Sequence, residues 1–461
     1  MTDIQQVIPP ARSAGRGFHA YSAKHLDMLA ARAGLAQDER LAVRAVATVL
    51  PFRTNSYVIE NLIDWAAAPD DPIYRLVFPQ PDMLPASDVR RLARLIETGA
   101  PEAVLRAAAH EIRMRLNPHP AGQLLLNAPN LHGRPLPGVQ HKYPETVLFF
   151  PRQGQTCHAY CTYCFRWAQF VDEPDLKMAT DDIGTLVAYL GQHPEVTSVL
   201  ITGGDPMIMG EPVLRRYLEP LLDPRLDHLE SIRIGTKSLS YWPQRFVTDP
   251  DADATLRLFG EVADSGRTLA LMAHFSHPRE LEPSVLAQAV RRIRATGAVI
   301  RTQAPLIRSI NDDPRTWRVM WRAQVRQGMI PYYMFVERDT GPQGYFAVPL
   351  ARAAEIYRDA YSSVSGLCRT VRGPSMSATP GKICVDGVAE IGGQKFFALH
   401  MIQARDASLV GRPFFAQFDP EAVWLSELRP AFADRFPFEI DAQQGGDPDS
   451  DWDVELLAPA G

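Results

Sequence analysis

The feature that most constrains the fold of this chain is an alternation of short apolar runs and helical patterns that begins at residue 147. Each apolar run is typical of a buried strand, and each is followed by a segment in which apolar residues recur at helical spacing. Such alternation implies parallel strands joined by helical crossovers, either in an open doubly wound sheet or in a full or partial barrel. The six predicted strands are VLFF (147–150), SVLI (198–201), SIRIG (231–235), TLALMA (268–273), AVIRTQ (298–303) and YYMFV (332–336).

The parts of the chain before and after this alternation have a different character. Residues 1–140 contain helical stretches such as HLDMLAARAGL and then a proline-punctuated connector. After residue 376 a hairpin is predicted, with its turn near Gly392 and Gly393. We therefore divide the chain into a helical region with its connector, an α/β region, a hairpin extension and a flexible acidic tail, at 1–140, 141–375, 376–440 and 441–461.

Composition and charge restrict the class of protein. Apolar residues make up 46% and charged residues 22% of the 461 residues, which is typical of a soluble globular protein. The formal net charge is -5 and the basic residues are scattered, so we expect no nucleic-acid partner. No apolar run approaches the roughly 18 to 20 residues that a membrane helix needs. We therefore expect no membrane association and place the protein in the cytosol.

Polar side chains follow the predicted strands. In barrels of parallel strands the active site lies at the carboxyl ends of the strands, because the strand-to-helix loops converge there. We therefore expect one polar mouth, although loops are polar in any protein and chance supplies part of such a pattern. Its members, in strand order, are Cys157, Cys161 and Cys164; TGGDP (202–206); GTK (235–237); HFSHP (274–278); Gln303; and Glu337, Arg338 and Asp339.

Three of the five cysteines lie within eight positions, in the stretch QTCHAYCTYCFR (155–166). In a reducing compartment clustered thiols more often bind a metal than form disulfides, and thiolates suit zinc or an iron–sulfur cluster. A structural zinc site would need a fourth ligand, for which Cys368, Cys384 and His158 are candidates. Three ligands without a fourth indicate instead a metal centre with one open position, where another molecule binds.

The spacing CHAYCTYC resembles the C-x3-C-x2-C signature of radical S-adenosylmethionine (SAM) enzymes. In that superfamily three cysteines bind a [4Fe-4S] cluster, and the fourth iron chelates the amino and carboxylate groups of SAM. The resemblance implies a reductant such as flavodoxin or ferredoxin, and it implies that the TGGDP segment lies at the methionine end of SAM. The residues concerned are Cys157, Cys161 and Cys164 for the cluster, and Gly203, Gly204 and Asp205 for SAM.

Further segments resemble the lysine 2,3-aminomutase group within this superfamily. They occur in the same order as in that group, and the match covers about residues 55–385. The segments are GVQHKYPETVL (138–148), CFR (164–166), TGGDP, RIGTKSLSYWPQR (233–245), HFSHP, TQAPLIRSIND (302–312) and PYY (331–333).

Members of this group also use pyridoxal phosphate (PLP), which is bound to a lysine fourteen positions after a cysteine. Counting from Cys368 places Lys382 there, although the group's glycine run before it is here SATPG; a solvated lysine in a turn is the alternative. The group binds the PLP phosphate with two basic residues around a tyrosine. The chain's matches to the cofactor residues are Lys142 and Tyr143, with Thr146 instead of the second basic residue, and Gln303, which matches a SAM contact.

The resemblance also implies which residues bind the substrate. Arg166 matches an arginine that binds the α-carboxylate, for which a guanidinium is well suited. Lysine-acting members hold the far ammonium with two aspartates, whereas Arg338 and Ser375 stand here, unless a shift of one residue brings in Asp339. An arginine repels a cationic side chain, and glutamate-acting members carry a basic and a neutral polar residue at these positions. We therefore expect an acidic or neutral polar amino acid as substrate.

These patterns predict an α/β fold: a partial (βα)6 TIM-like barrel with an N-terminal helical region and a C-terminal hairpin extension that carries the PLP lysine. The predicted activity is a radical SAM, PLP-dependent 2,3-aminomutase that moves the α-amino group of an amino acid to the β-carbon. The alternatives are a PLP-independent radical SAM enzyme acting on a peptide or natural-product intermediate, and a metal-stabilised binding protein. The group's C-terminal cysteine cluster for interchain zinc is absent, so a homo-oligomer would have to form in another way.

Overall fold

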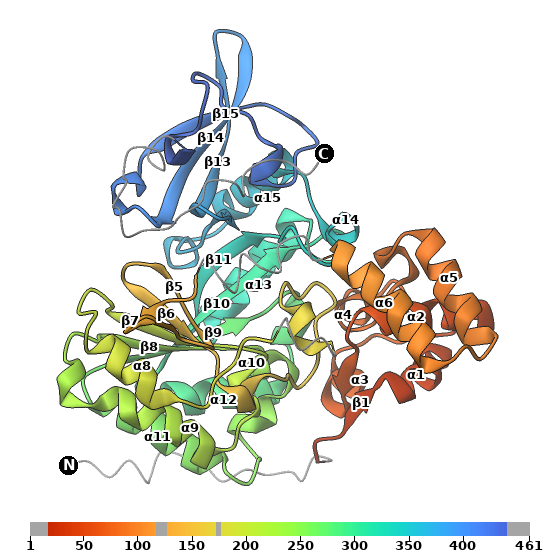
Figure 1. Ribbon diagram of the computed structural model, residues 1–461, viewed down its shortest axis with the longest axis horizontal. Helices are drawn as coiled ribbons and strands as arrows, with labels where there is room; N and C mark the ends of the chain where they lie inside the picture. The colour runs from red at the N-terminus through yellow and green to blue at the C-terminus, as the bar shows by residue number, and fades with distance from the viewer. Residues whose placement is uncertain (1–16, 117–126, 172–176, 440–461) are drawn as a thin grey trace.

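A mixed sheet of eleven strands runs through the centre of the protein (Figure 1). The computed structural model describes residues 17–116, 127–171 and 177–439, so the predicted acidic tail lies outside the described residues. Six neighbouring strands run parallel in chain order, and they are the six apolar runs of the sequence, which confirms an α/β fold. These strands are β6 (Thr146–Phe149), β7 (Ser198–Ile201), β8 (Ser231–Thr236), β9 (Thr268–His274), β10 (Val299–Leu306) and β11 (Ile330–Val336).

Further strands extend this sheet at both edges, and all but one of them pair only antiparallel. Strand β5 (Val139–Tyr143) pairs with β6; at the other edge β12 (Arg372–Ser377) runs parallel to β11 and is followed by β13 (Gly381–Ile391), β14 (Gln394–Ala404) and β15 (Pro413–Gln417). The predicted hairpin is β13–β14, and Gly392 and Gly393 turn it with φ of 60° and 78°. The sheet crosses the predicted boundary at 375/376 without a break, so the division into domains stays a prediction.

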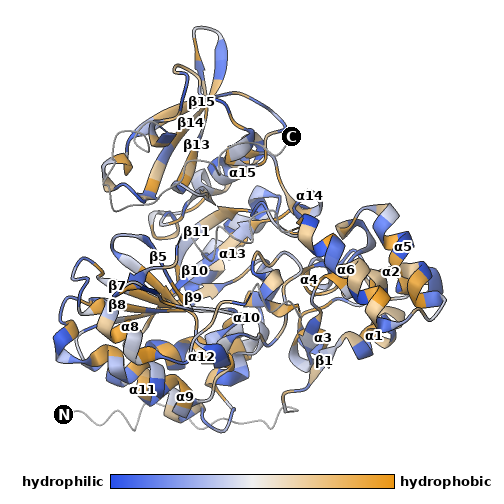
Figure 2. Cartoon of the chain, in the orientation of Figure 1, coloured by the Kyte–Doolittle hydropathy of each residue, from blue (hydrophilic) through white to orange (hydrophobic). Residues whose placement is uncertain are grey.

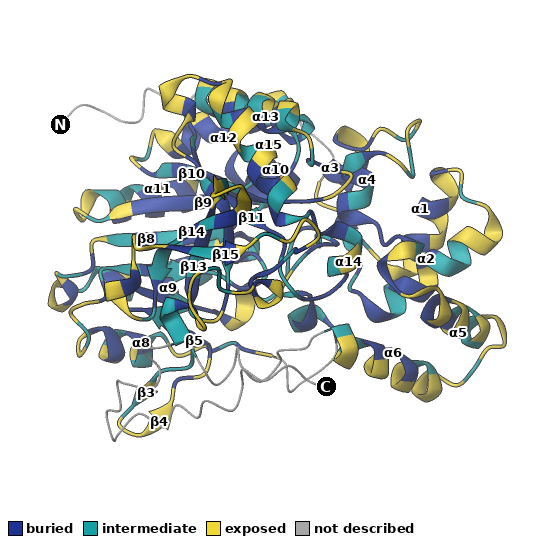
Figure 3. Cartoon of the chain, turned by 90° about the horizontal axis from the view of Figure 1, so that it is seen from above, coloured by how far each residue is buried: buried dark blue, intermediate teal, exposed yellow. Residues whose placement is uncertain are grey.

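Six helices between consecutive strands pack on one face of the parallel strands. Their apolar sides join the buried strand residues in one large core that includes Tyr217, Phe259 and Trp321. The strands are among the most apolar segments (Figure 2), and the outward faces of the helices are exposed (Figure 3). These helices are α8 (Ile183–Leu190), α9 (Glu211–Leu218), α11 (Ala252–Asp264), α12 (Ser284–Arg294), α13 (Pro314–Arg326) and α15 (Leu350–Ser362).

The strands alternate in burial, which shows that their two faces meet different surroundings. In β8 every second residue is buried in the helix-covered core, whereas Arg233 and Gly235 are partly exposed on the opposite face. Strand β10 repeats this pattern, with Arg301 and Gln303 partly exposed. Parallel strands covered on both faces are apolar throughout. The second face of this sheet therefore borders a polar space.

The N-terminal helices cover the carboxyl ends of the parallel strands. A second core joins them to residues of the loops that follow β6, β8 and β10, among them Trp167, Tyr241 and Ile307. The helices lie together at the right of Figure 1. They are α1 (Leu26–Arg32), α2 (Gln37–Val49), α3 (Ser56–Asn61), α4 (Pro72–Val77), α5 (Ala86–Glu97) and α6 (Glu102–Leu116), with a ribbon of β1 (Ala20–Ser22) and β2 (Arg53–Asn55).

The remaining elements are short. A ribbon of β3 (Asn130–Leu131) and β4 (Arg134–Pro135) precedes β5, and single turns of helix, α10 (Ser238–Tyr241) and α14 (Gln343–Phe346), follow β8 and β11. A third core packs β13 to β15 against α15 and includes Phe397 and Leu399. Within the described ranges, no helix combines the length and the apolar character that crossing a membrane requires.

Arg245 ties the loop after β7 to the start of α11. Its guanidinium donates to the carbonyl oxygens of Met207 (2.8 Å) and Met209 (3.0 Å), to Thr255 Oγ1 (3.0 Å) and to Asp251 (2.8 Å). The Arg245 side chain is only 4% exposed. Replacing it would leave the buried carbonyl oxygens of Met207 and Met209 without these donors and the Asp251 carboxylate without its cation.

We expect Arg245→Met to lower the free energy of unfolding by about 3 kcal/mol, because two buried carbonyl oxygens lose their donors and the partly buried Asp251 loses its cation. The matched control is Arg225→Met, since Arg225 pairs with Asp223 on the surface, where its side chain is 82% exposed. Surface pairs contribute roughly 0 to 1 kcal/mol. Thermal unfolding of both variants beside the parent chain checks this, and equal midpoints for the two variants would contradict it.

Candidate active site

The three clustered cysteines lie in the loop after β6, and the N-terminal helices hold this loop in place. Asn55 Nδ2 donates to the carbonyl oxygens of His158 (3.2 Å) and Tyr241 (3.0 Å), and its Oδ1 caps α3. The amide of Tyr160 donates to Arg53 O (2.8 Å), which adds a backbone bond to β2. The cysteine loop is therefore fixed from outside the sheet as well as from within it.

The spacing of the three thiols does not fit one bound ion. In the described part of the chain, one Cys/His/Asp/Glu group alone has its ligand atoms all within 4.8 Å, and it is not the group of Cys157, Cys161 and Cys164. His158, a candidate fourth zinc ligand, is buried and its Nδ1 lies 3.0 Å from Ser238 Oγ. Thiolates of an iron–sulfur cluster bind separate irons, so a wider spacing suits a cluster better than zinc.

The electrostatic surroundings of the thiols favour a bound cation. Burial raises the pKa of all three thiols, that of Cys164 to about 12, and the neighbouring thiols raise the pKa of Cys157 and Cys164 further. All five cysteines of the chain are free of disulfides. The bare thiols stay protonated at neutral pH, whereas a bound iron centre takes the place of these protons.

The two glycines of TGGDP lie directly against the start of the cysteine loop. A Cβ on Gly204 would fall 2.4 Å from Thr156 O, and one on Gly203, at φ 150°, would fall 2.3 Å from Gln155 Nε2. The amide of Gly204 donates to Gly154 O (3.0 Å). The glycines therefore allow the two loops to touch, which is a different reason for their presence from the predicted approach to SAM.

Asp205 joins the loops after β7 and β8. Its carboxylate is buried and accepts hydrogen bonds from Thr236 Oγ1 (2.7 Å), Lys237 N (2.9 Å), Met207 N (3.0 Å) and Ser238 Oγ (3.1 Å). Burial raises the pKa of Asp205, and these hydrogen bonds act in the opposite direction. The carboxylate positions both loops, and its predicted contact with SAM stays a prediction.

Two further pairs complete the mouth at the ends of β8, β9 and β10. Lys237 Nζ lies 2.8 Å from Glu280 Oε1, and both side chains are nearly buried. Gln303 Nε2 lies 2.6 Å from His274 Nε2, across the β9–β10 pairing. Burial and the charge of Lys237 lower the pKa of His274 to about 3, so this imidazole is neutral. The structure thus brings the predicted polar residues to one edge of the sheet.

Arg166 is a buried guanidinium with unmet donors. Its Nε and one Nη have no hydrogen-bond partner, and its face lies 4.2 Å from the ring centre of Phe150. Burial lowers the pKa of Arg166 to about 10, although Cys164 and Cys157 act against this shift. Leaving charged donors unpaired is costly, and a carboxylate matches both free N–H groups. Arg166 is therefore suited to bind a carboxylate beside the cysteines.

Lys382 and Lys142 lie in a second cluster, on the polar face of the sheet. Lys382 Nζ lies 4.3 Å from the ring centre of Tyr333 and 3.2 Å from Gln403 Oε1. Burial and the charges of Arg233 and Arg372 lower the pKa of Lys382 to about 7. Burial and further cations lower the pKa of Lys142 to about 6. The ionisable groups that shift these two lysines are all cationic: Arg233 and Arg372 for Lys382, and Arg405, Arg338 and Lys382 for Lys142.

Three arginines of this cluster were missed in the sequence. Arg233 Nη2 donates to Thr146 Oγ1 (3.3 Å) and its Nε has no partner, so a guanidinium from β8 reaches the position where the group's second basic residue is lost. Arg372 lies 4.5 Å from the ring centre of Tyr333, and Arg405 donates to Thr379 O (3.1 Å). For Arg233 the available signal was an arginine inside an otherwise apolar strand; Arg372 and Arg405 carry no such signal.

Arg338 belongs to this cluster, whereas Ser375 is held in a backbone contact. The charge of Arg338 lowers the pKa values of Lys142 and Tyr143, although burial raises that of Tyr143 overall to about 12. The Nε of Arg338 lies 3.5 Å from Asp339 Oδ1. Ser375 is fully buried on β12, where its hydroxyl donates to Met334 O (3.5 Å).

Comparison with known proteins identifies the family. No family model matches the chain. A protein named putative L-lysine 2,3-aminomutase from Aquifex aeolicus is 30% identical over 391 residues, which cover 85% of this chain and 91% of that protein. The L-lysine 2,3-aminomutase of Haemophilus influenzae is 27% identical over 232 residues, so the chain spans 64% of that relative's length.

A solved radical SAM methyltransferase from Sphaerobacter thermophilus aligns with 63% of this chain and 94% of its own, at 16% identity. Its TM-score of 0.36 is too low to establish a shared fold. The loop of three cysteines and the sequence relatives define a radical SAM enzyme. Within that superfamily, the chain belongs to the lysine 2,3-aminomutase family.

We expect Gly204→Ala to abolish assembly of an iron–sulfur cluster, because the added methyl group displaces the carbonyl of Thr156 at the start of the cysteine loop. Gly260→Ala is the matched control, since a Cβ there meets nothing within 4 Å and Gly260 lies within α11. Iron and sulfide per chain after anaerobic reconstitution report the result. Full iron content in Gly204→Ala would show that the two loops need not touch.

Proposed function

We propose that this protein is a radical SAM, PLP-dependent 2,3-aminomutase that acts on an acidic or neutral polar amino acid. The observation that carries the proposal is the cluster of cations around Lys382. Besides burial, Arg233 and Arg372 lower the pKa of Lys382, and Arg405, Arg338 and Lys382 lower that of Lys142. No acidic group is among those that shift the pKa of either lysine in the described structure. A site of this charge favours ligands that carry several negative charges.

The residues around Lys382 fit PLP. A buried amine with a pKa lowered to about 7 is a ready nucleophile, since much of it is uncharged at neutral pH. Lys142, from the edge strand β5, and Arg233, from the interior strand β8, act electrostatically on Lys382 or are acted on by it. They supply charge for a phosphate, with Tyr143 beside Lys142. Bound there, PLP would supply electron delocalisation at the substrate nitrogen, and the protein supplies orientation and charge.

The residues around the cysteines fit a cluster and SAM. Cys157, Cys161 and Cys164 would hold the iron, and the cofactor would supply a radical for hydrogen abstraction. Arg166 stands beside the cysteines with two free donors, so it orients the substrate carboxylate toward that centre. The N-terminal helices pack an apolar core against the loops of this mouth, and such cover would protect a radical from side reactions with water.

The proposal also includes the shape of the barrel, the source of electrons and the location of the protein in the cell. Lys142 of β5 donates to Ala378 O, which lies between β12 and β13. The strands that flank the six parallel strands on either side therefore approach each other, and this supports a partial (βα)6 barrel. A reductant such as flavodoxin or ferredoxin would reduce the cluster. The cytosol suits five free cysteines, and it supplies such reductants.

The pH dependence of PLP attachment tests the role of Lys382. We expect covalent attachment, trapped by borohydride, to rise with pH through a midpoint near 7, because the lowered pKa of Lys382 makes its reactive neutral form dominant above that value. Lys382→Ala should lose attachment, and the exposed Lys395→Ala should keep it. Mass spectrometry of the trapped protein measures both. Unchanged labelling in Lys382→Ala would leave the PLP-independent radical SAM enzyme as the better reading.

The choice of substrate tests the role of Arg338. Reconstituted enzyme should form β-isomers from acidic or neutral polar amino acids and not from lysine, because the cationic cluster repels a second ammonium. Arg338→Gln should raise KM for an acidic substrate by roughly 10- to 100-fold, which is the value of a hydrogen bond to a charged group. Arg352→Gln, an exposed surface arginine, is the control. Efficient turnover of lysine by the parent enzyme would overturn the substrate assignment.

A further inference from the structure

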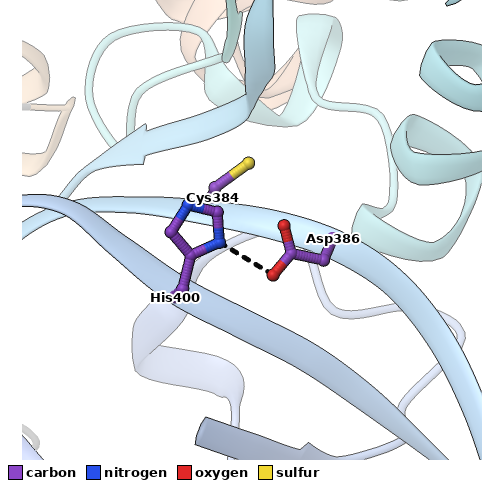
Figure 4. Close-up of side chains that lie close together, drawn as sticks. All are labelled: Cys384, Asp386 and His400. Atoms are coloured by element: carbon purple, nitrogen blue, oxygen red, sulfur yellow. Dashed lines mark hydrogen bonds and ion pairs between the residues drawn. The ribbon is translucent and has the colours of Figure 1, made fainter. Parts of the chain in front are cut away.

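The hairpin β13–β14 carries a sulfur, an oxygen and a nitrogen ligand on one face. Cys384 and His400 are direct cross-strand partners, and the carboxylate of Asp386, two positions after Cys384, lies against His400. Their ligand atoms all lie within 4.8 Å of one another, and this is the group that met that spacing among the described residues (Figure 4). Nothing in the proposed chemistry of Lys382 uses these side chains.

A β-bulge shapes this part of the hairpin. Val385 pairs with Leu399 and Gly387 with Ala398, so Asp386 is the extra residue between them. Bulges redirect side chains and occur next to functional sites. The Asp386 carboxylate accepts from His400 Nδ1 at 2.8 Å and holds the imidazole beside Cys384 (Figure 4).

The surroundings of Cys384 argue against a reactive thiol. A cysteine beside a histidine and an aspartate is also the composition of a nucleophilic triad. Burial and the charge of Asp386 raise the pKa of Cys384 to about 12, so the thiol is protonated at neutral pH and is a poor nucleophile. A metal ion that replaces the thiol proton removes this cost.

We propose that Cys384, Asp386 and His400 bind one zinc ion. A thiolate, an imidazole and a carboxylate are the ligands that zinc prefers, and zinc with three protein ligands keeps a fourth position for water. Ligand atoms around tetrahedral zinc lie roughly 3.3 to 3.8 Å apart, so small side-chain rotations complete the site. Zinc takes the place of the Cys384 thiol proton and of the proton that His400 Nδ1 donates to Asp386. Both protons leave to solvent from the imidazolium form, and one imidazole proton stays on Nε2 of His400.

The graded burial of the three residues suits entry of an ion. Cys384 is buried, His400 is partly exposed and Asp386 is exposed, so the site opens toward solvent on the side of the carboxylate. Zinc there would link β13 to β14 only two residues beyond Lys382. The ion would therefore make β13, the strand that carries this lysine, more rigid.

Zinc per chain in full-length variants tests the site. Parent protein, Cys384→Ser, His400→Gln and Asp386→Asn are dialysed against the same low zinc concentration and measured by elemental mass spectrometry. The control is Cys368→Ser, which removes a buried cysteine elsewhere. We expect the parent and Cys368→Ser to bind one zinc more per chain than Cys384→Ser and His400→Gln, and Asp386→Asn to bind zinc more weakly.

Two further readouts separate this result from misfolding and from the iron centre. His400 is partly exposed, so His400→Gln should fold, and zinc should raise the unfolding temperature of the parent and Cys368→Ser but not that of His400→Gln. Iron content reports whether Cys157, Cys161 and Cys164 bind their metal centre, and these three cysteines are unchanged in every variant. Equal zinc in the parent and His400→Gln, or no zinc in the parent, would overturn the proposal whether or not the iron centre assembles.

Discussion

The buried carboxylate of Asp205 is the contact on which the candidate active site depends. Four donors from its own loop and from the loop after β8 converge on it, and its amide donates to Thr156 O (2.7 Å) at the start of the cysteine loop. One charged group therefore fixes three loops relative to one another. A buried carboxylate is tolerated only when its acceptors are satisfied, so the loops cannot move apart separately without a large cost. These bonds of Asp205 therefore help to position the three thiols.

Much of the fold and of the metal centre could be predicted from the sequence, because both depend on residues that lie close together in the chain. The six parallel strands are short, mostly apolar segments, each followed by a helical pattern, and the hairpin turn carries two adjacent glycines at positive φ. The three cysteines are close in sequence, so their proximity in space needs no knowledge of the fold. Strand β12 was not predicted, since RGPSMS contains a glycine, a proline and no run of apolar residues. Its place in the sheet is decided by pairing with β11 and β13.

The basic cluster around Lys382 could not be predicted in the same way, since its members come from distant strands. Arg233 and Arg372 are far apart in sequence, and they meet because their strands present them on the same face. Their proximity also changes what the loss of the second basic residue at Thr146 means, because Arg233 reaches that threonine. The sequence likewise did not predict that the N-terminal helices cover the mouth, because residues such as Asn55 and Tyr241 come together only in the folded chain.

The cluster of basic groups around Lys382 and Lys142 has a consequence for the protein in its resting state. Mutual repulsion among these side chains is relieved by any anion that enters, and inorganic phosphate and chloride are abundant in cells. A phosphate-bearing cofactor then binds by displacing another anion and not by entering an unoccupied site. The apparent affinity falls as ionic strength rises, and the composition of the buffer becomes a variable of the measurement.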